Sequence, residues 1–347
     1  MKLIEYTPEQ APLLRQTVGH KNPFSSLLHP PFVDYYYTTN RCCRLYLIML
    51  EDGTVGAILG LERLRFEWNG RELELGFGSN FCSVRPGVGG VLFMHWLKSC
   101  QGGVVFGGSE ETHRIIHQQK WTYYPGVKSY RLNRSYPSYH GEAKWRSVAK
   151  SAREWICLRL ARYATRIPAI AAATTVHEEV HYDRTLLPSS SPFSFRFAPT
   201  LEYLAWRYNT GLSFVRYRLF RILQDGATRG YVVLNDQPHR LLIAQCDGDD
   251  PAVLSYGVLL SVLKASRDHG VPREVVLTCC HPVMRRIYER FGFVDSAEER
   301  PFALGSLRRE VDLPATDTSN WHINIDVGDN GLRAPFLDQE PPCPTVP

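Results

Sequence analysis

The chain has 347 residues, of which 44% are hydrophobic, 12% aromatic and 22% charged, and this composition excludes a disordered, fibrous or disulfide-stapled small protein. The length suits two domains of roughly 150 residues each. The formal net charge of +5 falls short of the dense basic surface of a DNA-binding protein, so we expect no DNA partner.

Signals for membranes, export and disulfides are absent from the sequence pattern. The longest run without Asp, Glu, Lys or Arg covers residues 251–263, which is shorter than the roughly 18 residues that a spanning helix needs. Glu5 and Glu9 interrupt the apolar stretch of a signal peptide. The nine cysteines include no C-x-x-C pair, which favours reduced thiols over disulfides or a zinc site. We therefore expect a cytoplasmic protein with no bound metal.

Two halves of the chain repeat the same order of elements. The first has a predicted strand around Gly56, a strand at 72–84, a helix at 89–99 and a buried strand at 104–106. The second repeats them around Gly230, at 239–246, at 253–268 and at 275–277. Within 71–77, Leu73, Leu75 and Phe77 lie on one face and Glu74 on the other. The repetition predicts two similar α/β units.

The segment between the halves differs from both. Residues 142–166 contain seven Lys or Arg against two Glu and have helical composition. They predict a basic helix, either one that contacts an acidic lipid surface or a nucleotide or one that is solvated and merely connects the units. Residues 321–327 alternate in polarity and predict a strand that completes the second sheet. The residues from 328 onward predict a flexible tail.

A glycine-rich loop in the first half predicts a phosphate site. It follows a strand and opens a helix, where glycine lets the backbone approach an anion and the free N–H groups attract it. The candidate residues are Ser83, Val84, Arg85, Gly87, Val88, Gly89 and Gly90. The equivalent loop of the second half carries Asp247, Asp249 and Asp250, whose charges would repel a pyrophosphate. This difference favours the first unit for a phosphorylated coenzyme.

Together these motifs resemble the GNAT (Gcn5-related) N-acyltransferase family. The second half resembles its final helix, from His281 to Phe293, and the first resembles its coenzyme loop, with Trp121 where the family's Gly-Phe falls. Residues 204–208 and 230–234 are further similar to tandem-GNAT acyltransferases of bacterial sugar and polysaccharide pathways, a group related in fold to FemAB transferases. The resemblance covers about residues 20–310.

The resemblance implies an α/β fold of two tandem GNAT-like domains, each a mixed, mostly antiparallel sheet flanked by helices. The predicted domains are 1–140, which binds acyl-CoA, and 173–327, joined by a basic helical linker at 141–172 and followed by a tail at 328–347. It also implies transfer of an acyl group, acetyl in the first instance, from acyl-CoA to a primary amine. An amino sugar, nucleotide sugar or cell-envelope precursor is the acceptor class that it favours.

The catalytic residues that the resemblance implies are divided between the halves. Tyr288 matches the position of the family's general acid, whereas the first half has Ile116 there, with His113 and His117 nearby on one helical face. Glu74 is the candidate general base, with a solvated strand carboxylate as the alternative. Because neither half holds a full set, a non-catalytic double-GNAT binding module remains an alternative. A FemAB-like aminoacyl transferase would instead explain the basic segment.

Two further motifs have competing interpretations. Residues 177–181 spell H-E-x-x-H, the pattern of zinc metallopeptidases, but the β-branched residues before it favour a strand over the helix that such a site needs. Trp206, Arg207 and Tyr208 could stack on and pair with a nucleotide-sugar acceptor, or could anchor the end of a helix under the second sheet.

Overall fold

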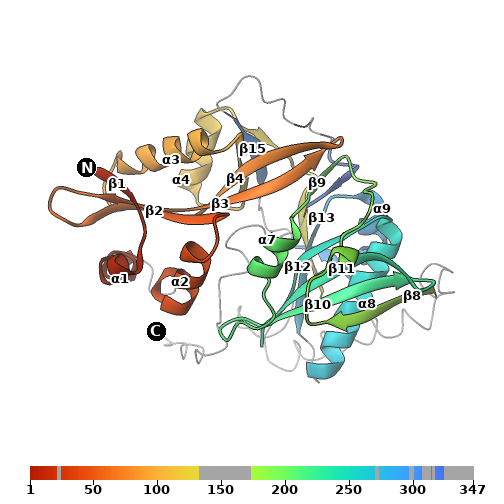
Figure 1. Cartoon of the computed structure of the whole chain (residues 1–347). Helices are drawn as coiled ribbons and strands as arrows, with labels where there is room; N and C mark the ends of the chain where they lie inside the picture. Colours follow the sequence, from red (N-terminus) through yellow and green to blue (C-terminus); the bar gives the residue numbers. More distant parts are fainter. Residues whose placement is uncertain are drawn as a thin grey trace, which may run out of the picture.

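The computed structural model describes residues 1–21, 25–132, 173–238, 240–269, 273–296, 301–306, 314 and 317–323. Two β-sheets with helices on their faces make up this part of the chain (Figure 1). The predicted basic helix at 142–166 and the predicted tail lie outside the described residues, and so does the boundary at 140. None of the described helices is both long and apolar enough to cross a membrane.

The first sheet contains most of the strands of the first half. Helices α3 (Val88–Ser99) and α4 (Glu110–Gln118) cover one face, and α1 (Ala11–Lys21) and α2 (Pro30–Thr38) lie on the other (Figure 1). Its strands, in spatial order, are β1 (Lys2–Glu5), β2 (Cys43–Met49), β3 (Val55–Trp68), β4 (Arg71–Ser83), β5 (Gly102–Phe106), β15 (Phe302–Gly305) and β6 (Thr122–Tyr123), with β9 (Phe195–Phe197) beside β3 and β16 (Trp321–His322) beside β9.

The second sheet repeats this plan. Helices α8 (Pro251–His269) and α9 (Pro282–Arg290) pack together on it, and α7 (Leu201–Arg207) lies in the chain between its strands β8 and β10. Its strands, in spatial order, are β14 (Val294–Asp295), β7 (Lys128–Leu132), β13 (Glu274–Cys279), β12 (Arg240–Gly248), β11 (Ala227–Asp236), β10 (Tyr217–Gln224) and β8 (Thr174–Glu179). Short 3₁₀ turns cover Pro8–Gln10, Ser26–Leu28 and Arg184–Leu186.

The predicted duplication is confirmed by the two sheets. The order β3, β4, α3, β5, α4 in the first half matches β11, β12, α8, β13, α9 in the second. Local sequence explains the hairpins, because Asn69-Gly70 between β3 and β4 and Asp225-Gly226 between β10 and β11 have positive φ angles. Asn-Gly and Asp-Gly supply the left-handed residues that tight two-residue hairpin turns require.

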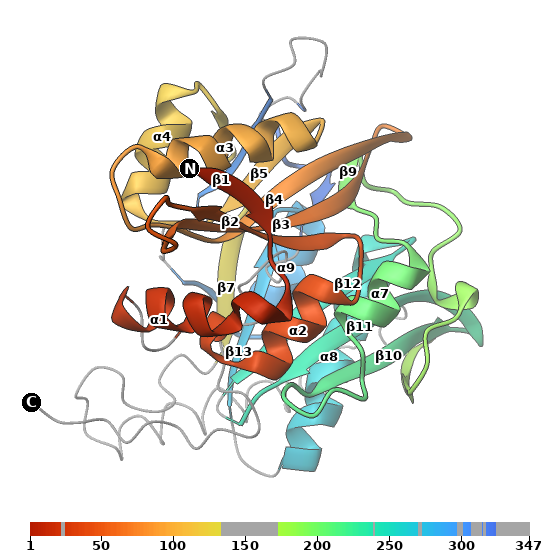
Figure 2. The same ribbon diagram turned by 60° about the vertical axis from the view of Figure 1, so that its left-hand side comes forward.

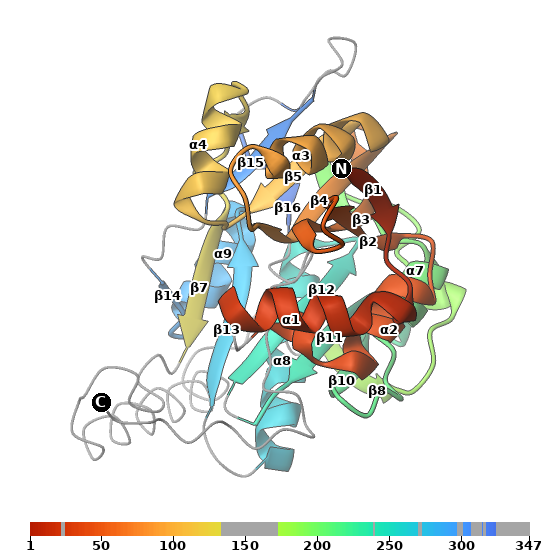
Figure 3. The same ribbon diagram turned by 90° about the vertical axis from the view of Figure 1, so that its left-hand side faces the viewer.

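Each sheet is completed by a strand from the other half of the chain. Strand β7 lies between β13 and β14, with Tyr130 opposite Leu277, although it belongs to the first half. Strand β15 lies between β5 and β6, with Ala303 opposite Val105, although it belongs to the second half. Figures 2 and 3 show the yellow β7 beside the blue β13. The two units are therefore joined by reciprocal strand exchange.

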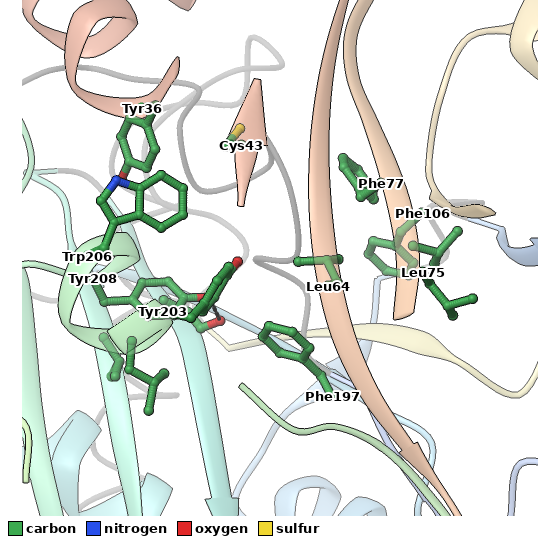
Figure 4. Close-up of a cluster of buried hydrophobic side chains, with 14 of the residues drawn as sticks. Tyr36, Cys43, Leu64, Leu75, Phe77, Phe106, Phe197, Tyr203, Trp206 and Tyr208 are labelled. Carbon is green, nitrogen blue, oxygen red and sulfur yellow. Dashed lines mark hydrogen bonds between the residues drawn. The ribbon is translucent and has the colours of Figure 1, made fainter. Parts of the chain in front are cut away.

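A buried polar network also joins the halves. Arg207 of α7 is fully buried and its guanidinium donates to Glu62 Oε1 of β3 (3.3 Å) and to the hydroxyls of Tyr36 and Tyr217 (3.1 Å each). The Tyr203 hydroxyl donates to the same Glu62 oxygen (2.6 Å). Tyr36 and Tyr203 of this network also belong to a buried hydrophobic cluster, which includes Trp206 of α7, Leu64 of β3 and Leu75 of β4 (Figure 4).

The segment 317–323 packs between the two sheets. Trp321 and His322 pair with β9 of the first sheet, so the prediction that residues 321–327 complete the second sheet is wrong where the strand is described. The deciding contacts are aromatic, because Trp321 lies against Phe195 and Tyr124, with ring centroids 4.5 and 4.7 Å away. Alternation predicts a strand but does not identify its neighbour.

The first prediction concerns the buried ion pair. Arg207→Ala leaves the Glu62 carboxylate buried without its cation, which should lower the free energy of unfolding by about 3–5 kcal/mol. Arg65→Ala, which removes the exposed Arg65–Glu72 pair (2.8 Å), serves as the control and should cost less than about 1 kcal/mol. Urea unfolding measures both, and equal losses in the two variants would contradict the prediction.

The second prediction concerns pH. Burial above all, with smaller contributions from nearby Arg196 and His281, outweighs the hydrogen bond to the Cys246 carbonyl and lowers the pKa of His322 from 6.5 to about 4. Between pH 6.5 and 4 the unfolded state therefore binds a proton on His322 that the folded state does not bind. The neutral His322 contributes its full stabilisation above pH 6.5, and this contribution is lost as the pH falls towards 4. The loss should amount to about 3 kcal/mol.

The measurement compares urea midpoints at pH 7 and pH 4.5. His322→Gln keeps a side-chain N–H but has no titrating group, so its midpoint should depend less on pH than that of the wild type. If both proteins lose stability to the same extent, another group governs the acid sensitivity.

Candidate functional site

The candidate site begins where β4 and β5 part. These parallel strands pair at Leu75–Gly102, Gly76–Gly103 and Phe77–Val104. Beyond Phe77, β4 continues for six residues to Ser83 with no strand partner on that side among the described residues. The strand then leads into the glycine-rich loop, and β5 leads into α4. The loop, the unpaired edge of β4 and the start of α4 therefore come to one end of the sheet.

The glycine-rich loop gives α3 an N-terminus without a side-chain cap. Gly87 is the N-cap residue at φ +81°, a left-handed conformation that favours glycine, and it has no side chain that could accept from the first helical N–H groups. A Cβ at Gly90 would meet no atom within 4 Å, whereas one at Gly89 would lie 3.1 Å from Ser83 Cβ. The Val88 N–H makes only a long contact with the Arg85 carbonyl (3.4 Å), and the Gly90 N–H makes one with the Gly87 carbonyl (3.3 Å). The outer side of this helix end is therefore accessible to an anion that competes with these contacts.

The other loop residues have distinct environments. The Ser83 hydroxyl donates to the Arg85 carbonyl (2.7 Å), and Val88 is buried. Val84 is 40% exposed. The Arg85 guanidinium pairs with Asp52 (2.9 Å), and both side chains are largely exposed. Arg85 therefore remains accessible to an anion that competes with this partner, since exposed pairs are weak.

The equivalent loop of the second unit is occupied by its own side chains. Asp250 Oδ1 accepts from the N–H groups of Ala252 (2.7 Å) and Val253 (2.9 Å) at the start of α8. Asp249 pairs with Arg229 (3.0 Å). Because a carboxylate already caps this helix, its N-terminus has no open donors for a phosphate.

The parting of β12 and β13 is also filled. These strands pair up to Leu242–Val276, and four residues further along the chain lie Cys246 on β12 and Cys280 directly after β13. His322 Nε2 contacts the Cys246 carbonyl (2.8 Å), and the Cys280 thiol donates to the Trp321 carbonyl (3.2 Å). The segment 321–323 thus lies across this end of the second unit.

The structure does not bring the two predicted catalytic residues into one site. Glu74 is half-buried on β4, before the strands part, and its backbone N–H donates to Gln101 (2.7 Å). Tyr288 is 2% exposed in the core under the second sheet, where burial raises its pKa well above the usual value. Both roles stay predictions.

In the first unit, the position that matches the expected general acid is Ile116, which has no hydroxyl. Ile116 is fully buried, and His117 is exposed on α4. His113 Nδ1 lies 3.3 Å from the hydroxyl of Tyr123, which is partly buried and whose pKa is raised by that burial. The Tyr123–His113 contact was not apparent from the sequence, because the two residues lie on different elements.

Two alternatives raised by the sequence fare differently. The first three residues of the H-E-x-x-H motif lie in strand β8 and the last two in a bend after it, so the motif forms no helix, as the β-branched residues predicted. Glu178 forms a two-pronged pair with Arg218 (both 2.7 Å). The described residues contain no cluster of three or more metal-ligating side chains. Trp206, Arg207 and Tyr208 are all buried at the interface between the units, which favours the anchor interpretation over contact with an acceptor.

Sequence reasoning missed a polar group beside the unpaired edge of β4. Tyr37 of α2, Ser79 and Asn80 contact one another there. The only local signal was Asn80 itself, since asparagine adopts left-handed backbone conformations more readily than most residues. Its partner Tyr37 lies 43 residues earlier and could not be found from local pattern.

Comparison with known proteins shows the fold. No family model matches the chain, and no curated protein is similar to it in sequence. A GCN5-related N-acetyltransferase from Anabaena variabilis is similar in structure, with a TM-score of 0.55 and 10% identity over 87% of this chain and 72% of that chain. A tandem GNAT protein from the clavulanic acid biosynthesis pathway has a TM-score of 0.51 and 12% identity, over 87% of this chain and 97% of that chain.

A third similar structure is a GCN5-related glucosamine N-acetyltransferase region of a fungal multi-domain GH3 β-N-acetylglucosaminidase. Its TM-score is 0.50 and its identity 8%, over 88% of this chain and 38% of that chain. At these identities the likeness concerns the fold alone. The expected architecture of two tandem GNAT-like units, each a sheet flanked by helices, is thereby confirmed.

Proposed function

We propose that the protein is an N-acyltransferase that uses acyl-CoA, acetyl-CoA in the first instance, and binds it on the first unit. One observation carries the proposal: the unpaired edge of β4 beyond Phe77 leads directly to an α3 N-terminus without a side-chain cap. In the second unit the equivalent helix is capped by Asp250 and the equivalent strand end is covered by residues 321–323. The two units thus share a fold but differ in what they can bind.

The residues that would hold the coenzyme follow from this geometry. The N–H groups from Gly87 to Gly90 and the Arg85 guanidinium would bind the pyrophosphate, because anions are stabilised at a helix N-terminus. The unpaired backbone of β4 would donate to the thioester carbonyl. The coenzyme supplies the activated acyl group, and the chain's contribution is to hold that group in place and to stabilise the charge on its oxygen during attack by the amine.

For the acceptor we propose a primary amine, with an amino sugar or cell-envelope precursor as the class to test first. We choose this class because one of the proteins with a similar fold is a glucosamine N-acetyltransferase region. Glu74 on β4 is the carboxylate that we propose as general base. The burial of Trp206, Arg207 and Tyr208 gives no support to an acceptor site on those residues.

A second candidate function is a binding module without catalysis. The observation that favours it is the division of the expected residues: Ile116 replaces a hydroxyl in the first unit, and Tyr288 is buried in the second. Release of thiol in the presence of a panel of amines distinguishes the two functions. Binding of acetyl-CoA without thiol release would favour the binding module.

The third prediction tests the coenzyme site by calorimetry with acetyl-CoA. Gly90→Asp places a carboxylate in the third position of α3, where nothing lies within 4 Å of the new Cβ. An acidic residue in the first turn stabilises a helix, so the variant should fold as well as the wild type. It should nevertheless bind acetyl-CoA at least about tenfold more weakly, because the carboxylate repels the pyrophosphate.

Two control variants accompany this measurement. Gly90→Asn has nearly the same size without the charge and should lose less affinity. Ala252→Asp adds the same charge to the first turn of α8 and should leave the affinity unchanged, since we place no coenzyme there. Equal losses in Gly90→Asp and Ala252→Asp, or no binding by the wild type at millimolar acetyl-CoA, would contradict the proposal.

A further inference from the structure

Strand β4 contains a bulge at the point where it loses its partner. Against β3, Gly60 pairs with Ser79 and Ile58 with Cys82, so that Leu59 alone faces the two residues Asn80 and Phe81. Asn80 has φ +52°, in the left-handed region. An extra residue of this kind bends a strand and changes the direction of its backbone groups. The bulge begins within three residues of Phe77, the last residue of β4 that pairs with β5.

A tyrosine from α2 holds this bulge. The Asn80 side-chain amide donates to the Tyr37 hydroxyl (2.9 Å), and the Ser79 hydroxyl lies 3.4 Å from the same oxygen. Tyr37 is 2% exposed, and its ring packs edge-on against Phe32 with centroids 6.0 Å apart. The tyrosine is therefore fixed by packing, and its hydroxyl meets the bulge at a defined place.

The sequence makes room for this contact at Gly60. A Cβ there would lie 2.7 Å from the Tyr37 hydroxyl and 2.4 Å from Ser79 Oγ, which are distances that side chains do not tolerate. Glycine in a strand interior weakens the strand, so its presence marks a close approach of other groups. Strand β3, strand β4 and helix α2 thus all contribute to one arrangement.

We propose that Tyr37 is a positioning residue that acts through Asn80 to hold the β4 bulge, so that the bulge backbone contacts the acyl-thioester end of the coenzyme. This inference rests on the proposed function. The bulge comes before Ser83 in the chain and the phosphate loop comes after Ser83. We therefore place the acyl-thioester end of the coenzyme at the bulge and its pyrophosphate at the loop. Tyr37 itself is buried and touches no substrate. Its effect is to fix the left-handed conformation of Asn80 in the free protein.

The test measures binding of two ligands by calorimetry. One is acetyl-CoA, and the other is the adenosine bisphosphate fragment of the coenzyme, which lacks the pantetheine arm. Tyr37→Phe keeps the ring and removes the hydroxyl, and it should weaken acetyl-CoA binding about three- to tenfold, the usual effect of one hydrogen bond. Binding of the fragment should not change, because the phosphate loop is untouched.

Variants of the partner residue separate the hydrogen bond from the backbone conformation. Asn80→Gly removes the amide but accepts a positive φ, and it should match Tyr37→Phe, with no further loss in the double variant. Asn80→Ala also strains the backbone and should lose more. Tyr35→Phe is the matched control, since it removes a neighbouring hydroxyl that donates to the Trp206 carbonyl (2.8 Å) at the interface. It should leave both affinities unchanged.

The outcomes are distinguishable. The inference is supported if Tyr37→Phe binds acetyl-CoA more weakly but binds the fragment as the wild type does, and if the double variant loses no more affinity than either single variant. Unchanged binding in Tyr37→Phe, or equal weakening of both ligands together with a lower melting temperature, overturns it and leaves the proposed function intact. Failure of the wild type to bind either ligand overturns the proposed function, and this inference with it.

Discussion

The two halves of this protein are held together by backbone hydrogen bonds that neither half can form alone. Without β15, the outer edge of β5 would present unpaired N–H and C=O groups, and without β7 the same would hold for β13. The buried Arg207–Glu62 pair joins α7 of the second half to β3 of the first, so it too forms only when the two halves lie side by side. The interface is thus part of both units.

Within this shared frame the two units have diverged at matching positions. In each unit two parallel strands separate at one end of the sheet, β4 from β5 in the first and β12 from β13 in the second. A helix follows the first strand of each pair, and its N-terminal backbone donors lie at this end. In the first unit no side chain caps the donors of the helix, and the Val88 and Gly90 N–H groups make only long contacts with backbone carbonyls (3.4 and 3.3 Å). In the second unit the Asp250 carboxylate accepts from the helix N–H groups, and at the strand the His322 ring contacts the Cys246 carbonyl. The two units therefore share a fold but differ at this end, where only the second has a side-chain carboxylate that caps its helix.

Local pattern predicted much of the fold. Alternation of Leu73, Leu75 and Phe77 located β4, the glycine loop located the start of α3, and the β-branched residues before His177 correctly favoured a strand. Long-range choices were not predictable, because β7 and β15 look like ordinary strands and nothing in their residues specifies which sheet they join. The contact between Tyr37 and Asn80 was missed for the same reason, while the roles of Glu74 and Tyr288 depended on resemblance alone.

The exchange of strands also governs how the chain can fold during synthesis. Strand β5 leaves the ribosome early, but its neighbour β15 begins at Phe302, after nearly all of the second half has been made. Contacts between residues so distant in sequence form slowly, because a long loop has to close before they are gained. Until β15 is made, the first sheet therefore has one open edge at which it could pair with another chain and aggregate.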